Sequence, residues 1–168
     1  MNLPDSVEVI HAQAFSNGTN SSAKYTMNKL PANLRLLGNQ AFYMTSPNAT
    51  FSEIPDNLNV ISSQAFMSSK GIKIDTFPTR DGECFIGYQS FAYVPATGIT
   101  TLTINKPWKL DLTNELAQTN TAFKDGYSDV KKLIVHSEFS DLDEASIWRL
   151  VFGREMVEGI NEIEILEG

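Results

Sequence analysis

The sequence predicts an α/β repeat solenoid, in which short parallel strands stack in about six coils. Three observations predict this fold. A Pro-to-Phe segment occurs four times, a strand-like stretch precedes three of its prolines, and further strand-like stretches recur in the second half. A short strand cannot bury its apolar side alone, so each coil needs a neighbour stacked against it. We expect one domain over residues 1–168, with regular short repeats over 3–91 and longer, divergent repeats over 92–168.

The Pro-to-Phe segments share their spacing. The prolines are Pro4, Pro31, Pro55 and Pro78, and the first three lie eleven residues before a phenylalanine. A small residue precedes the ring in each segment and once more in the second half: Ala14–Phe15, Ala41–Phe42, Ala65–Phe66, Ser90–Phe91 and Ala122–Phe123. The small residue lets neighbouring backbones approach, so we expect these rings to stack in one aromatic spine.

Alternating apolar residues predict strands centred near residues 27, 51, 74, 104, 135 and 165. Proline ends each of the first three because it has no N–H to donate to a sheet. Stacked in register, the positions between the strand apolars would form one outward ladder: Thr26, Thr50, Lys73, Thr103, Ile134 and Glu164. We expect this strand face to bind a partner. The alternative is that threonine simply suits an exposed strand position.

The repeating pattern Leu/Ile-Pro-x-x-Leu/Val-x-x-Ile-x-x-x-Ala-Phe, with a short strand after it, resembles the BspA-like leucine-rich repeat family. The resemblance is close over residues 3–91. It is partial over 92–168, where Ala122–Phe123 is all that remains of the Pro-to-Phe pattern. The Cys or Asn expected soon after the Phe is absent from most coils. The resemblance implies a parallel solenoid and a role as a surface or adhesion protein.

The longer coils have room for helical segments on the convex side, one of them longer. We expect a helix near 141–152, opened by the Ser140 side chain and closed by Gly153. Its apolar face would carry Leu142, Ala145, Trp148 and Phe152, so Trp148 is expected in the core. Residues 111–118 are a weaker second candidate.

Candidate catalytic and metal-binding residues are few. His136 stands beside Ser137 and Glu138, but no spacing of nucleophile, base and orienting group accompanies them. His11 takes the position of Gly38 in the next coil, so we expect a turn residue there. The predicted protein is therefore non-enzymatic, without a catalytic residue, metal or cofactor.

Cys84 is the one cysteine, so no intramolecular disulfide is possible. It aligns with Glu8, Arg35 and Asn59, polar positions between apolar ones, and we expect a partly exposed thiol.

A net charge of −7 argues against nucleic-acid binding, and no apolar run is long enough to insert into a membrane. No basic stretch followed by an apolar one opens the chain, so we expect no signal peptide in it. Three glycosylation sequons begin at Asn17, Asn20 and Asn48, and whether they are used stays open.

We predict a binding or adhesion module for a protein or glycan, outside the cell or on its surface. The alternative is a structural component of a phage virion or cell-surface array, self-associated through its solenoid ends.

Overall fold

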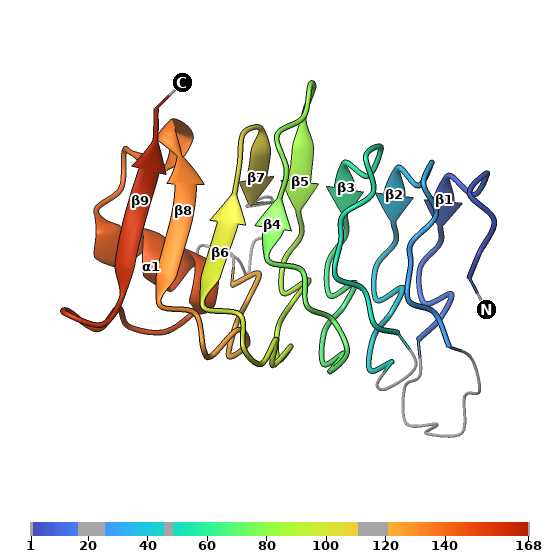
Figure 1. Ribbon diagram of the computed structural model, residues 1–168, viewed down its shortest axis with the longest axis horizontal. Coiled ribbons are helices and arrows are strands. Elements are labelled where there is room, and N and C mark those ends of the chain that lie inside the picture. The colour runs from blue at the N-terminus through green and yellow to red at the C-terminus, as the bar shows by residue number, and fades with distance from the viewer. Residues whose placement is uncertain (1, 17–25, 46–48, 111–120, 168) are drawn as a thin grey trace.

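Figure 1 shows the computed structural model of the chain, which describes residues 2–16, 26–45, 49–110 and 121–167. The chain winds into a β-solenoid of about five turns. Its coils stack along one long axis, with the first coils at one end and the last strand at the other (Figure 1). The asparagines of the three sequons and the weaker helix candidate at 111–118 lie outside the described residues.

In the described residues, two parallel sheets run along the solenoid. The first, which we call the β1–β7 sheet, contains one strand from each Pro-to-Phe segment and a fifth strand after them: β1 (Val9–Ile10), β2 (Leu36–Leu37), β3 (Val60–Ile61), β5 (Cys84–Ile86) and β7 (Trp108–Leu110). The second, the β4–β9 sheet, contains β4 (Thr76–Phe77), β6 (Thr101–Ile104), β8 (Lys132–His136) and β9 (Glu162–Leu166).

The strands predicted near residues 104, 135 and 165 are confirmed as β6, β8 and β9 of the β4–β9 sheet. The strand predicted near residue 74 forms later along the chain, as β4. In the earlier coils the corresponding stretches are joined by a parallel bridge between Met27 and Ala49, and by a hydrogen bond of 2.8 Å from the Lys73 N–H to the Phe51 carbonyl. The sequence does not predict the β1–β7 sheet, because strands of two or three residues are too short to show an alternation.

The core lies between the two sheets. Each sheet turns alternate residues inward, as strand geometry requires. Inward residues that are at most 3% exposed include Ile10, Leu37, Ile61 and Ile86 from one sheet and Leu102, Ile104, Leu133 and Val135 from the other.

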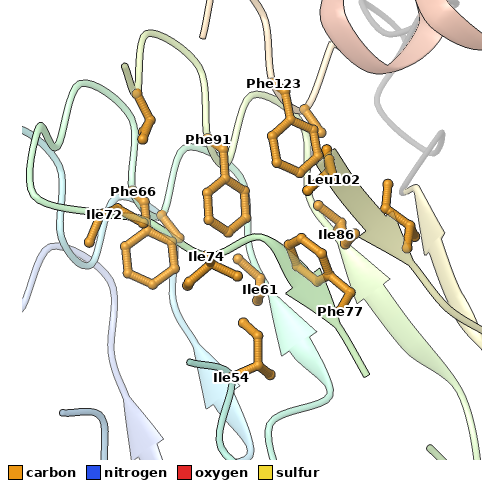
Figure 2. Packing of buried hydrophobic residues seen from close by; sticks show 14 of the residues in the cluster. Ile54, Ile61, Phe66, Ile72, Ile74, Phe77, Ile86, Phe91, Leu102 and Phe123 are labelled. Carbon is orange, nitrogen blue, oxygen red and sulfur yellow. The ribbon is translucent and has the colours of Figure 1, made fainter. Parts of the chain in front are cut away.

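The predicted aromatic spine is confirmed. The ring centroids of Phe15, Phe42, Phe66, Phe91 and Phe123 follow one another at 5.2, 5.7, 5.2 and 5.0 Å. Figure 2 shows Phe66, Phe91 and Phe123 in a row above the inward isoleucines. The backbones of neighbouring coils are hydrogen-bonded at the same place. Each of the first four spine Phe N–H groups donates to the carbonyl of the residue before the next spine Phe.

A sixth ring, which the repeat pattern does not predict, extends the spine. The Phe123 N–H donates to the Val151 carbonyl at 3.0 Å, as the Phe91 N–H does to Ala122. Phe152 follows at 6.1 Å from Phe123. Val151 and Phe152 therefore take the place of the small residue and Phe in the last coil.

The helix predicted near 141–152 is present but shorter than predicted. It is α1 (Glu144–Phe152), preceded by a short 3-10 segment, η1 (Ser137–Phe139). The Asp143 carboxylate, not Ser140, accepts the Ser146 N–H at 2.7 Å and caps the helix. Because α1 begins at residue 144, Leu142 lies outside it and is 44% exposed, which contradicts its predicted place on the buried face.

The buried face of α1 consists of Ile147, Trp148, Val151 and Phe152. Trp148 is in the core, as predicted, whereas Ala145 is exposed, which corrects its predicted place. Gly153 ends the helix in a left-handed conformation, as expected. The parallel stacking predicted for the fold is thus confirmed, and the described residues contain little helix beyond α1.

Candidate partner-binding face

The strand face is the outward side of the β4–β9 sheet and of the pre-proline stretches before it. Thr26, Thr50, Lys73 and Glu164 are exposed, and Thr103 and Ile134 are half-buried. Their neighbours Ile74, Leu102, Ile104, Leu133 and Val135 are buried. All six predicted residues therefore lie on the outward side.

The predicted ladder is in register only in its second half. Thr103 pairs with Ile134, and Ile134 pairs with Glu164. The partner of Thr103 on the other side is Thr76, not Lys73. The in-register row is thus Thr76–Thr103–Ile134–Glu164, and Lys73 lies three residues before it along the chain.

A shift within residues 72–77 explains this correction. Ile74 and Phe77 are buried, but the two residues between them, Asp75 and Thr76, are both exposed, so the alternation is interrupted there. The Tyr127 hydroxyl donates to the Ile74 carbonyl at 2.6 Å across 53 residues of sequence, and thereby satisfies a buried acceptor where the pairing changes. An alignment of apolar residues cannot show such a shift.

Charge gathers at the carboxyl-terminal part of the face. The Lys132 ammonium lies 2.8 Å from the Glu164 carboxylate and 3.7 Å from that of Glu162. The hydrogen bond to Glu164, followed by the charge of Glu164, raises the pKa of Lys132. The earlier part of the face also carries hydroxyl and amide groups, with Asn28, Thr50 and Ser52 all exposed.

A cleft of about 220 Å³ opens between the two coils that the Met27–Ala49 bridge joins. Its lining includes Asn28 and Ser52 of the strand face and the charged Lys29, Glu53 and Asp56. The cleft gives the otherwise flat face a concave region that can accept a side chain or a sugar ring.

The other candidate residues have structural roles. His136 is 2% exposed, and its Nε2 bonds the Trp108 carbonyl at 2.9 Å. His11 is exposed directly after β1, where a turn residue was expected. No group of three or more His, Cys, Asp or Glu side chains that could hold a metal occurs among the described residues.

Cys84 corrects the prediction of a partly exposed thiol. It is fully buried in β5, with Trp108 of β7 beside it. Burial raises the pKa of the Cys84 thiol, and the Arg80 charge opposes the rise. The polar residues at the aligned positions give no sign of this burial, although Cys84 keeps their place in the register of the sheet.

A second row of polar side chains lies outside the predicted strand face, although the sequence contains its pattern. A glutamine precedes the small residue and Phe in four coils, at 13, 40, 64 and 89. Its Nε2 donates to the Oε1 of the next glutamine at 2.9, 2.8 and 3.1 Å in turn. We call this row the glutamine ladder.

Comparison with known proteins places these coils in a family. No helix of the described part of the chain is long and apolar enough to cross a membrane. A search of curated proteins found no match to the chain. The profile of the BspA type leucine rich repeat region, in 6 copies, matches residues 1–114. The chain therefore belongs to the BspA-type leucine-rich repeat family.

Proposed function

We propose that this protein is a non-enzymatic binding or adhesion module that presents its strand face to a protein or glycan partner, outside the cell or on its surface. The observation that carries the proposal is the in-register outward row Thr76–Thr103–Ile134–Glu164. Solenoids commonly recognise partners along such extended faces because successive coils repeat the same outward positions.

The composition of the face supports a macromolecular ligand. A hydroxyl- and amide-rich part, which contains the cleft, and a Lys–Glu network lie along one side of the molecule. A partner that spans several coils would meet both. The exposed Lys73 and the paired Lys132 and Glu164 would then set its orientation, since charged rims contribute specificity and association rate.

The experiment is a comparison of binding to arrays of extracellular proteins and oligosaccharides. The strand-face variant carries Lys73→Glu, Glu164→Lys, Thr50→Ala and Thr103→Ala. Its matched control carries Glu8→Lys and Arg35→Glu, a charge reversal of an exposed pair beside the other sheet. We expect partners of the native protein to lose roughly tenfold or more in affinity for the first variant and little for the control. If both variants bind the partners as tightly as the native protein does, the strand face is excluded as the binding site.

An assembly component, such as a part of a virion or cell-surface array, is the second candidate. The observation that favours it is β9, an edge strand of its sheet among the described residues. Ile163 and Ile165 of β9 are half-buried, and the nearby Ile160 is 60% exposed. Light scattering over a wide concentration range should then show a mass that grows with concentration and falls with Ile160→Lys. A constant monomer mass would contradict this candidate.

A further inference from the structure

The glutamine ladder lies in the turns that carry the aromatic spine. Gln13, Gln40, Gln64 and Gln89 all adopt a left-handed backbone conformation, with φ between 52° and 61°. Glutamine enters this region at a cost, since the side chain crowds the carbonyl. The turns before the first four spine Phe residues therefore share one backbone conformation, and their four amides follow one another from coil to coil.

The ladder fixes the orientation of each amide. A carboxamide offers two N–H donors and an oxygen with two lone pairs. Within the ladder Gln40 accepts from Gln13 and donates to Gln64, and Gln64 accepts from Gln40 and donates to Gln89. Each interior amide thus uses one donor and one lone pair on its neighbours and has one of each remaining for a ligand.

A shallow groove of about 370 Å³ runs beside these amides. Ala12, Asn39 and Ser63, the residues before the first three glutamines, complete its lining. No residue of this lining is charged. Every polar group that it offers is an amide or a hydroxyl, which both donates and accepts hydrogen bonds.

A tyrosine continues the row of the groove in the next coil. The Gln64 N–H donates to the Tyr88 carbonyl as the Gln40 N–H donates to the Ser63 carbonyl. Tyr88 therefore takes the position of Asn39 and Ser63, and its side chain is half-buried. Ligand sites combine such apolar surfaces with a few fixed polar groups, which set the orientation of the ligand.

We propose that the glutamine-ladder groove binds a neutral oligosaccharide. A sugar presents C–H faces, which suit a tyrosine ring, and adjacent hydroxyl groups, which both donate and accept like the amides of Gln40 and Gln64. The uncharged lining offers no counter-charge to a sulfated or sialylated chain. Because the ladder already holds the amides, binding costs little side-chain entropy. This site lies apart from the strand face and does not depend on the function proposed for it.

The test is an array of immobilised neutral, sialylated and sulfated oligosaccharides, followed by calorimetric titration with the neutral sugars that bind. Ser63→Arg fills the groove and leaves the ladder amides in place. Ser128→Arg is the matched control, a hydroxyl-to-arginine change at an exposed position outside the groove and the strand face. Thr103→Arg makes the same change on the strand face. We expect neutral sugars to bind the native protein and Ser128→Arg alike, and to bind Ser63→Arg roughly tenfold or more weakly.

Gln64→Met provides a second variant, which removes the amide at nearly constant volume, and circular dichroism checks that each variant folds. It too should bind neutral sugars more weakly. Absence of sugar binding, binding of the charged sugars alone, or unchanged binding by a folded Ser63→Arg variant would overturn the proposal. Loss of binding in Thr103→Arg alone would assign the sugar to the strand face instead.

Discussion

Tyr127 stabilises the place where the pairing between coils shifts. It is completely buried, and its hydroxyl is the hydrogen-bond donor to the Ile74 carbonyl. Burial, and after it the charge of Asp75, raises the pKa of Tyr127 well above its ordinary value, although the bond to Ile74 opposes the rise. The Tyr127 hydroxyl therefore links two coils. Its raised pKa also makes the stability of the folded protein depend on pH in the alkaline range.

We predict that Tyr127→Phe lowers the free energy of unfolding at neutral pH by about 1–3 kcal/mol, because a buried carbonyl loses its donor. Denaturant unfolding of both proteins measures this difference. Arg154→Lys is a useful comparison, since the Arg154 guanidinium donates to the Tyr127 and Gly126 carbonyls without touching the Ile74 bond.

The pH dependence has a definite sign. The folded protein holds the Tyr127 proton more tightly than the unfolded chain does, so the stabilisation is complete below about pH 10 and is lost as the pH rises above it. The native protein should therefore lose stability above about pH 10 more steeply than Tyr127→Phe does. If the free energy of unfolding falls equally with pH in both proteins, Tyr127 does not contribute to the pH dependence.

At the scale of the elements, the aromatic spine was predictable and the two sheets only partly so. The Ala–Phe pairs mark the spine because one small residue and one ring recur in each coil. The β1–β7 sheet leaves no such sign in its strands of two or three residues. Repeat spacing likewise does not determine that Asp143 rather than Ser140 caps α1, or that Cys84 is buried.

The spine should contribute unequally along its length. Phe66 is fully buried and contacts the rings of Phe42, Phe51 and Phe91. Phe15 is half-buried and stacks on Phe42. We predict that Phe66→Ala lowers the free energy of unfolding by about 3–5 kcal/mol, the usual cost of a large buried cavity. Phe15→Ala should lower the free energy of unfolding clearly less in the same denaturant titration. Equal losses for the two variants would contradict a spine whose central rings contribute more to stability than its first ring.

For the whole molecule, the sequence predicts which side faces outward but not how the outward residues line up. All six strand-face residues lie outward. Their register changes at residues 72–77, where two exposed residues follow one another and Tyr127 satisfies the Ile74 carbonyl. The glutamine ladder could have been found, since glutamine recurs before the small residue and Phe in four coils. Its amide bonds depend on the left-handed turns, which the sequence does not reveal.

Backbone hydrogen bonds join the coils of the solenoid to one another. The N–H groups of Phe42, Phe66, Phe91 and Phe123 all donate to a carbonyl of the next coil, at 2.7, 2.7, 2.7 and 3.0 Å. Native-state hydrogen exchange, read residue by residue by NMR, tests this directly. We predict that these four amides exchange only when the solenoid opens as a whole, far more slowly than the amide of the exposed Gly82. Exchange of the four at the rate of Gly82 would contradict the stacked coils on which both proposed surfaces depend.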